Sequence, residues 1–238
     1  MLKKKLIIIP AYNESTNLIH VVEDIEKNAP DFDYVIINDC SKDDTEQICK
    51  DNNFNYVSLP INLGIGGGMQ TGYKYAQRHG YDVAVQFDGD GQHDAAYLGA
   101  LLKEMEDTRA DMVIGSRFIN KEGFQSSFTR RVGIRFFEKL IKIVSGKRIT
   151  DATSGFRMVN RKIINEFCEY YPKDYPEPES IVAVIRNNYE VKEVPVLMRE
   201  RMGGTSSIVN YKAIYYMIKV TLAITIDRLK PKRKENAS

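Results

Sequence analysis

The stretch Val83-Ala-Val-Gln-Phe-Asp-Gly-Asp-Gly-Gln-His-Asp94 decides the fold, because an apolar run passes directly into glycines and acids. The apolar part predicts a buried strand, and the polar part predicts a turn that ends it. The same order occurs twice earlier, where Pro10-Ala-Tyr-Asn-Glu14 follows one apolar run and Asn38-Asp-Cys-Ser41 ends another. Helix-like segments separate these runs. The alternation predicts a doubly wound, mostly parallel α/β sheet.

The expected elements follow from apolar periodicity. In the first half we expect strands at Leu6–Ile9, Tyr34–Asn38, Tyr56–Leu59, Val83–Phe87 and Met112–Gly115, and helices at Asn17–Lys27, Asp43–Asn52, Gly67–Arg78 and Tyr97–Asp107. Ser41 and Asp94 are the expected N-caps of the second and fourth helices. In the second half we expect a helix at Phe128–Val144, a strand at Ser154–Val159, a helix at Glu179–Asn187 and a strand at Glu190–Val196.

Size and charge exclude several classes of protein. The 238 residues suit one α/β domain, placed at 1–205, with a short appendage at 206–238. A net charge of +2 argues against a nucleic-acid binder that acts by overall charge. Three widely spaced cysteines match neither a disulfide framework nor a zinc site. The short apolar run before Pro10 does not resemble a signal peptide, so we expect a cytoplasmic protein.

Three polar segments are expected to converge on one site. Each follows a strand, and the carboxyl ends of parallel strands share one edge of the sheet, where open α/β sheets bind ligands. Asp88 and Asp90 are separated by one glycine, so a tight turn directs both toward one ion, with Gln92 as a third oxygen ligand. Such ligands suit Mg²⁺ or Mn²⁺ bridging a diphosphate. His93 is either a further ligand or a residue that orders its neighbours.

The chain contains other motifs that resemble known sites only in part. An EF-hand is excluded, because His93 and Gly99 stand where its glycine and final glutamate are needed. The glycine-rich segment Gly64–Gly72 fits neither a dinucleotide fingerprint nor a P-loop, since Met69 replaces the third glycine and no Gly-Lys-Ser/Thr follows. It predicts a helix N-terminus that backbone or ligand approaches closely. A helix cap is the structural alternative for Asp39 and for Asp94.

Taken together, the motifs resemble those of family 2 glycosyltransferases, most of all the dolichyl-phosphate mannose and bactoprenyl-phosphate glucose synthases. The resemblance covers roughly residues 5–160 and rests on Pro10–Glu14, Asn38–Ser41, Asn62-Leu-Gly64, Asp88–His93, Gly115-Ser-Arg117 and Ser154-Gly-Phe-Arg157 in this order. It implies a Rossmann-like GT-A fold, a nucleotide-diphosphate sugar donor, Mg²⁺ or Mn²⁺, and inversion at the anomeric carbon.

The resemblance also assigns residue roles. It implies a nucleotide-sugar site made of Pro10, Tyr12, Glu14, Asp39, Asn62, Gly64, Gly68, Asp88, Gly89, Asp90 and Arg201, the last before a flexible segment that closes over the diphosphate. Asp88, Asp90 and Gln92 match the metal motif, and Asp90 is counted as catalytic. Arg117 and Arg157 match positions that hold acceptor or donor phosphates; a surface salt bridge is the structural alternative for each arginine.

Two departures from the family concern the acceptor. Asp94 stands where this branch has proline or a small residue, and no pair of C-terminal transmembrane helices is recognisable. The segment Tyr175-Pro-Glu-Pro-Glu179 occupies the place of an acidic catalytic motif, so Glu177 or Glu179 is a candidate base. A hydroxyl acceptor requires such a base, whereas an ionised phosphate does not. A proline-braced turn that caps the next helix is the alternative.

The C-terminal part predicts a membrane-facing or subunit-facing helix. Ile208–Ile226 is apolar on nearly all faces and a basic tail follows, but nineteen residues with two interior lysines are a poor transmembrane span. An interfacial helix and a core or dimer-interface helix are equally consistent with it. With the basic, apolar segment Arg130–Lys147, it favours a peripheral protein at the cytoplasmic leaflet of the cell membrane.

We therefore expect an inverting hexosyltransferase that uses a UDP-, GDP- or dTDP-linked sugar in cell-surface polysaccharide or glycolipid synthesis. The expected acceptor is a polyprenyl phosphate or a polyprenyl-linked sugar, with a sugar hydroxyl of a growing glycan as the alternative. Two hypotheses come from other classes: a metal-dependent phosphohydrolase, and a non-catalytic nucleotide-sugar-binding subunit. The sequence leaves the sugar, the base and the oligomeric state open, including a homodimer or a membrane partner.

Overall fold

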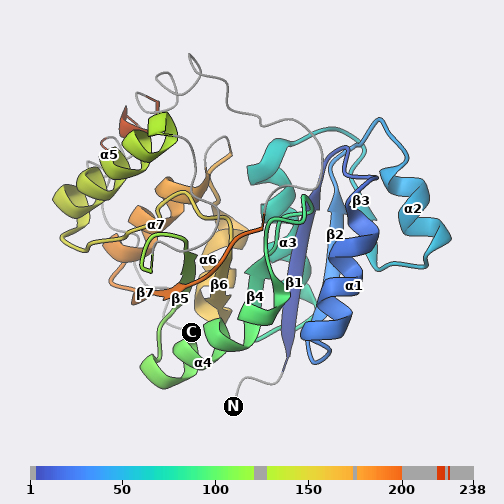
Figure 1. Cartoon of the computed structure of the whole chain (residues 1–238), viewed down its shortest axis with the longest axis horizontal. Coiled ribbons are helices and arrows are strands. Elements are labelled where there is room, and N and C mark those ends of the chain that lie inside the picture. The colour runs from blue at the N-terminus through green and yellow to red at the C-terminus, as the bar shows by residue number, and fades with distance from the viewer. Residues whose placement is uncertain (1–3, 121–127, 174–175, 200–218, 223–224, 226–238) are drawn as a thin grey trace.

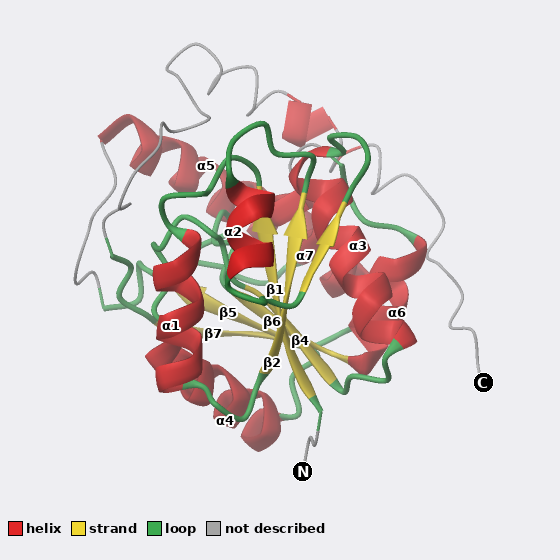
Figure 2. Cartoon of the chain, turned by 90° about the vertical axis from the view of Figure 1, so that its right-hand side faces the viewer, coloured by secondary structure: helices red, strands yellow, loops and turns green. Residues whose placement is uncertain are grey.

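A computed structural model of the chain describes residues 4–120, 128–173, 176–199, 219–222 and 225. One seven-stranded sheet runs through it in the order β3-β2-β1-β4-β6-β5-β7, and helices cover both of its faces (Figure 1, Figure 2). The strands are β1 (Lys5–Ala11), β2 (Asp33–Asn38), β3 (Tyr56–Ser58), β4 (Val83–Gln86), β5 (Met112–Ser116), β6 (Arg157–Asn160) and β7 (Val191–Pro195). Four of the six neighbouring strand pairs are parallel, as the doubly wound prediction requires, and the two pairs that involve β6 are antiparallel.

The helices alternate with these strands. They are α1 (Leu18–Asn28), α2 (Thr45–Asp51), α3 (Gly64–Arg78), the 3₁₀ turn η1 (Ala95–Tyr97), α4 (Leu98–Thr108), α5 (Phe128–Ser145), α6 (Arg161–Glu169) and α7 (Pro176–Arg186). Among the described residues, none of these helices is long and apolar enough to cross a membrane. The predicted helix at Ile208–Ile226 lies mostly outside the described residues.

The two faces of β1 show why this sequence folds with a covered sheet. Leu6 and Ile8 belong to one buried cluster with α3, α6 and α7, whereas Ile7 and Ile9 belong to a second cluster with α1 and α4. Successive side chains of a strand point to opposite faces, so an unbroken apolar run requires helices on both sides. The run from Leu6 to Ile9 therefore selects the layered α/β fold.

The structure corrects the sequence predictions at several elements. β6 runs antiparallel to both of its neighbours, β4 and β5. α6 was not predicted, although Asn160 caps it by accepting hydrogen bonds from the backbone of Lys162 and Ile163. α3 begins three residues before the predicted start. Ser41 is not the N-cap of α2, because that helix begins only at Thr45.

Candidate active site

The three polar segments meet at the carboxyl edge of the sheet, as the sequence predicts. The strands that carry them, β2, β1 and β4, are adjacent and parallel. The Asp39 backbone N–H donates to the Ala11 carbonyl at 2.9 Å. A Cβ built on Gly89 would lie 3.2 Å from the Pro10 carbonyl oxygen and 3.6 Å from Cγ of Glu14. Gly89 thus permits the loop after β4 to lie directly against the loop after β1.

Asp88 is held from two sides. Its Oδ1 accepts a hydrogen bond from Nε2 of Gln86 at 2.9 Å, and its Oδ2 lies 3.6 Å from Nε2 of His93. The backbone N–H of Asp88 donates to Nδ1 of His93 at 3.0 Å. About a third of the Asp88 side chain remains exposed, 34%, so the carboxylate is fixed but still reachable by a ligand.

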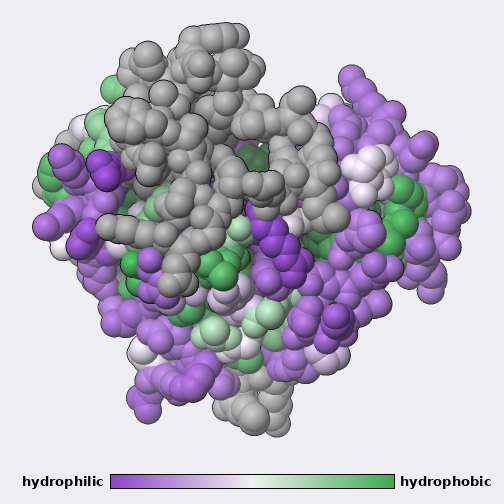
Figure 3. All heavy atoms as spheres, in the orientation of Figure 1, coloured by the Kyte–Doolittle hydropathy of each residue, from purple (hydrophilic) through white to green (hydrophobic). Residues whose placement is uncertain are grey.

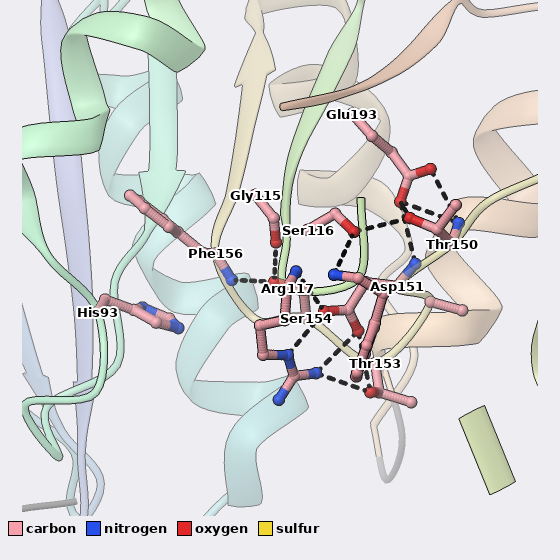
Figure 4. A network of polar contacts seen from close by, with 12 residues as sticks. His93, Gly115, Ser116, Arg117, Thr150, Asp151, Thr153, Ser154, Phe156 and Glu193 are labelled. Carbon is pink, nitrogen blue, oxygen red and sulfur yellow. Dashed lines mark hydrogen bonds and ion pairs between the residues drawn. The ribbon is translucent and has the colours of Figure 1, made fainter. Parts of the chain in front are cut away.

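His93 orders its neighbours from inside the fold. Only 3% of the residue is exposed. Its ring stacks on Phe156 with centroids 4.9 Å apart and meets the edge of Phe87 at 5.3 Å. Because both ring nitrogens face Asp88, the structure favours the ordering role that the sequence left open for this histidine. Figure 4 shows His93 beside Phe156.

The rest of the loop is fixed around Asp90 and Gln92. Oδ1 of Asp90 accepts from the backbone N–H of Gln92 at 3.0 Å, and Gly91 between them has a φ of 76°, a conformation that glycine adopts without strain. The Gln92 carbonyl accepts from the backbone N–H of Arg199 at 2.9 Å. Asp90 is 6% exposed. The turn therefore holds Asp90 and the backbone of Gln92 in a defined position next to Asp88.

Asp94, the departure from the family pattern, closes this loop. Its Oδ1 accepts from the backbone of Ala96, which makes it the N-cap of η1. It also forms an ion pair with Arg199 at 3.0 Å, and Arg199 reaches Asp24 on α1 at 3.1 Å. Asp24 in turn accepts from the backbone of Ala95. Asp94 thus takes part in an ion-pair cluster at the position where the resemblance implies proline or a small residue.

The loop suits a divalent ion whose coordination is completed by a ligand. Two carboxylates and an amide supply hard oxygen donors, the type that Mg²⁺ and Mn²⁺ prefer. Among the described residues, no group of three His, Cys, Asp or Glu side chains forms a closed metal cage. An open site of two acids is what Mg²⁺ uses when diphosphate oxygens provide further ligands.

Asp39 acts as a helix cap in this structure. It is 5% exposed, and its two carboxylate oxygens accept from the backbone N–H groups of Leu63 and Gly64 at 2.7 and 2.8 Å. Asn62 donates to the Asp39 carbonyl at 3.0 Å. These contacts tie the loop after β2 to the start of α3. Tyr12, in contrast, is 43% exposed at the same edge.

The glycine-rich segment is a packing surface. A Cβ on Gly66 would lie 2.2 Å from the Pro172 carbonyl oxygen, and a Cβ on Gly72 would lie 2.2 Å from Cγ2 of Ile8. Gly68 is buried and faces Ile37, whereas Gly64, with a φ of 73°, lies at the start of α3. The glycines let backbone approach α3, as the sequence predicted, and the approach on Gly66 comes from residues 172–173.

Arg117 forms a buried ion pair, not the surface salt bridge that was the structural alternative. Its Nε and Nη2 donate to the two oxygens of Asp151 at 2.7 and 2.8 Å, and Nη2 also donates to Thr153. The Asp151 side chain has no exposed surface and that of Arg117 has 11%. Burial opposes the charge of Arg117, but Asp151, with a smaller contribution from Asp88, outweighs it and raises the pKa of Arg117.

Figure 4 shows this ion pair within a wider network. The Glu193 carboxylate on β7 accepts from the backbone N–H groups of Thr150 and Asp151, and Ser154 donates to the Gly115 carbonyl at 2.7 Å. Burial raises the pKa of Glu193, although these hydrogen bonds oppose the shift. The network fixes residues 150–155 between β5 and β7.

Arg157 is the largest fully buried side chain of the described residues, with 1% exposed. Its guanidinium donates to the carbonyls of Ser154 and Glu177 at 2.7 and 2.8 Å and to the Ser180 hydroxyl at 2.7 Å. These donors are directed at the protein, so the structure does not place Arg157 on a phosphate. It joins the Ser154–Arg157 segment to the first turn of α7.

That first turn carries both candidate bases, Glu177 and Glu179. Burial raises the pKa of Glu177; the guanidinium of Arg157 opposes the shift and the charge of Asp88 adds to it. The pKa of Glu177 is therefore above the ordinary value of glutamate, and the charge of Asp88 contributes to the shift. Tyr175 and Arg201 lie outside the described residues, as does the glycine segment after Arg201.

Sequence reasoning assigned no role to three residues around the site: Gln86, Gly155 and Asp151. Gln86 is a polar residue at the end of an otherwise apolar strand, and this was the only feature of the sequence that could have drawn attention to it. A Cβ on Gly155 would lie 2.7 Å from Oδ2 of Asp88, a contact that no local pattern reveals. A hollow of about 590 Å³ at the other edge of the sheet, lined in part by Arg109 and Lys162, contains none of the predicted site residues.

Comparison with known proteins identifies the family. The model described as "Glycosyl transferase family 2" matches residues 6–168. The chain belongs to glycosyl transferase family 2. It is 27% identical to the UDP-N-acetylglucosamine–dolichyl-phosphate N-acetylglucosaminyltransferase of Methanococcus voltae, over 93% of this chain and 97% of the relative.

Two further family 2 relatives are similar over most of this chain. The polyprenol monophosphomannose synthase of Mycolicibacterium smegmatis is 27% identical over 92% of this chain and 86% of the relative. The undecaprenyl-phosphate mannosyltransferase of Micrococcus luteus is 28% identical over 85% of this chain and 86% of the relative. This family 2 chain is therefore a glycosyltransferase, as the motifs predicted.

The fold of this family 2 enzyme is GT-A. The glucosyl-3-phosphoglycerate synthase of Mycobacterium tuberculosis superposes with a TM-score of 0.72 at 15% identity, over 95% of this chain and 80% of that one. The same synthase has been solved with Mn²⁺, UDP and its product, with a TM-score of 0.70. At this identity the likeness establishes the architecture alone.

Proposed function

We propose that this chain transfers a sugar from a nucleotide-diphosphate sugar to a polyprenyl phosphate, with inversion at the anomeric carbon. The observation that carries the proposal is the Asp88–Asp94 loop, fixed at the carboxyl edge of a GT-A sheet with two carboxylates in one turn. Relatives named for dolichyl-phosphate, polyprenol and undecaprenyl-phosphate match along most of the chain, and they support the choice of acceptor.

The reaction is an in-line displacement. An acceptor oxygen forms the new bond to the anomeric carbon while the bond to the diphosphate breaks, and the nucleoside diphosphate leaves with the electron pair. A divalent ion, when bound, neutralises the charge that develops on this leaving group. Asp88 and Asp90 would hold that ion with Gln92, and His93 would keep the Asp88 backbone in place. Tyr12, exposed at the same edge, is available to contact the base.

The proposal is tested by incubating purified protein with Mn²⁺, a short polyprenyl phosphate and labelled UDP-, GDP- and dTDP-sugars in turn. Label that enters the organic phase as a lipid labile to mild acid would establish both the donor and the acceptor. Slow donor hydrolysis with no labelled lipid would count against a polyprenyl phosphate and in favour of a hydroxyl acceptor. Release of inorganic phosphate from an aryl phosphate would instead support a phosphohydrolase.

A sugar hydroxyl is the second candidate acceptor, because burial raises the pKa of Glu177 and so suits it to remove a proton. For a phosphate acceptor we expect Glu177→Gln to retain transfer within about tenfold of the parent, since no base is needed. A base would contribute about a hundredfold or more. It would also make transfer rise with pH through a pKa above the ordinary 4.5 of glutamate.

The measurement is the pH profile of kcat for the parent and for Glu177→Gln, with Glu179→Gln, the variant of the other candidate base, measured in parallel. An acidic limb that disappears only in Glu177→Gln, together with a large loss of kcat, would contradict the phosphate acceptor. The glutamine keeps the shape of the side chain near Arg157, so the comparison tests ionisation and not packing.

We also propose that the enzyme acts at a membrane surface through α5. This helix packs on α7, with Phe137 and Ile141 buried, but Phe136 and Ile143 are 40% and 74% exposed. Residues seven apart share one side of a helix. The exposed cations Arg135, Lys139 and Lys142 lie beside this apolar edge. The apolar side of α5 is therefore wider than the part that packs against the domain, and cations lie along its exposed edge. This pattern is typical of a helix that binds at a membrane interface.

Replacement of Phe136 and Ile143 by serine is expected to reduce co-sedimentation with anionic liposomes by about tenfold or more, because each exposed apolar side chain contributes about 1.5–3 kcal/mol when buried. Binding of the parent should also fall at high salt. The matched control is Ile61→Ser, which changes a 62% exposed residue after β3, at the other end of the sheet (Figure 1). Equal binding by all three proteins would remove α5 from the proposal.

A further inference from the structure

Gln86 is a buried amide at the last position of β4. It is 1% exposed and follows Val83, Ala84 and Val85, which are fully buried. In the sheet it lies in register with Ile8 on β1 and with Arg157 on β6. An apolar residue is the default at such a position, because a buried amide is costly unless its hydrogen bonds are made.

The hydrogen bond that Gln86 makes goes to the candidate metal ligand. Its Nε2 donates to Oδ1 of Asp88 at 2.9 Å. Gly155 encloses this contact, because a Cβ there would lie 2.8 Å from Nε2 of Gln86 and 2.7 Å from Oδ2 of Asp88. The amide and the carboxylate therefore meet in a space that only a glycine leaves open.

The other half of the amide has no partner. Oε1 of Gln86 is one of four buried side-chain atoms among the described residues that lack a hydrogen-bond partner. A flipped amide would turn Oε1 toward the carboxylate, so the orientation with Nε2 on Asp88 is the favourable one. An amide that is half satisfied costs the fold stability, which indicates that a requirement other than stability keeps it there.

We propose that Gln86 is a positioning residue for Asp88. From inside the sheet it fixes the rotamer of the carboxylate, so that the exposed part of that group faces the divalent ion before the ion arrives. His93 does the same for the backbone of Asp88. The inference rests on the metal site proposed above. Residues that orient a metal ligand typically change metal affinity by tenfold to a hundredfold when they are replaced.

The test measures Mn²⁺ binding to the whole protein by electron paramagnetic resonance, with Mn²⁺ alone as the probe. Gln86→Met removes the donor and keeps an unbranched chain of similar length. We expect it to weaken Mn²⁺ binding about tenfold while the melting temperature stays the same or rises. A purely structural role gives the opposite result, a lower melting temperature and unchanged binding. The Mn²⁺ concentration for half-maximal sugar transfer should rise in parallel.

Two further variants distinguish an effect on the position of the Asp88 carboxylate from a general effect on folding. Gly155→Ala adds a methyl group next to both the Gln86 amide and the Asp88 carboxylate. We expect this variant to weaken Mn²⁺ binding as well. Gln70→Met is the matched control, because the Gln70 amide donates to the carbonyls of Phe167 and Cys168; it should leave Mn²⁺ binding unchanged.

The outcomes distinguish this inference from the proposed function. Parent protein that does not bind Mn²⁺ would overturn the metal site itself. Parent protein that binds Mn²⁺, with binding lost in Asp88→Ala but within twofold of the parent in Gln86→Met, would overturn only the role of Gln86.

Discussion

Replacement of Asp90 by alanine is expected to reduce sugar transfer by roughly a thousandfold, the scale on which groups that stabilise developing charge act. The variant removes one of the two carboxylates that are proposed to hold a divalent ion, and so lowers the negative charge of the site. Its fold should persist. The lost hydrogen bond to the Gln92 backbone is worth about 1 kcal/mol, which corresponds to a melting temperature lower by about 2–4 °C in a chain of this size.

Asp90→Asn is the matched control for the shape of this turn. It keeps an oxygen that can accept from Gln92 and removes only the charge, so it should melt like the parent and still lose transfer. Thermal unfolding and the transfer assay are measured on the same preparations. An Asp90→Ala protein that is unfolded at room temperature would make Asp90 a structural residue, and an active Asp90→Asn protein would remove its charge from the mechanism.

Replacement of Arg117 by methionine is expected to destabilise the protein by about 3–5 kcal/mol, because it leaves the carboxylate of Asp151 buried without its partner. The side chain of Asp151 has no exposed surface, so its charge depends on the hydrogen bonds that it accepts inside the protein. At about 2–4 °C per kcal/mol, the melting temperature should fall by roughly 10 °C. Thermal unfolding by circular dichroism measures the change.

The double variant Arg117→Met with Asp151→Leu provides the control. Removing both charges should restore much of the lost stability, since a buried ion pair replaced by apolar residues is often neutral. If Arg117→Met melts within two or three degrees of the parent but does not transfer sugar, the arginine acts on substrate phosphate as the family resemblance implies, and the ion pair is secondary.

Local sequence was sufficient for the strands and for the shared edge on which the motifs meet. The run Leu6–Ile9 predicted a strand, which the structure confirms as part of β1, and the two clusters on either side of β1 show that both of its faces are buried. The direction of β6 could not be predicted from the sequence, because a central strand is equally apolar whether it runs parallel or antiparallel to its neighbours. α6 could have been predicted, since Asn160, a typical N-cap residue, precedes apolar residues at helical spacing, Ile163, Ile164 and Phe167.

The site residues also fall into those that local sequence predicts and those whose surroundings it does not. Asp88, Asp90 and Gln92 lie within five residues, so their spacing alone predicted that they act together. The surroundings of the arginines depend on contacts that are distant in sequence: Asp151 is 34 residues from Arg117, and the Glu177 carbonyl is 20 residues from Arg157. No local pattern distinguishes an arginine that binds phosphate from one that binds its own backbone.

The position of β6 determines when the site can form during synthesis. β4 and β5 are consecutive in the chain, but β6 lies between them in the sheet. Until Arg157–Asn160 has left the ribosome, β4 presents an unpaired edge and β5 lacks both of its neighbours, an arrangement that favours aggregation. Gly155, which encloses the Asp88 carboxylate, arrives with the same segment. The metal site proposed around Asp88 would therefore be complete only after β6 has joined β4, long after the aspartates themselves have been synthesised.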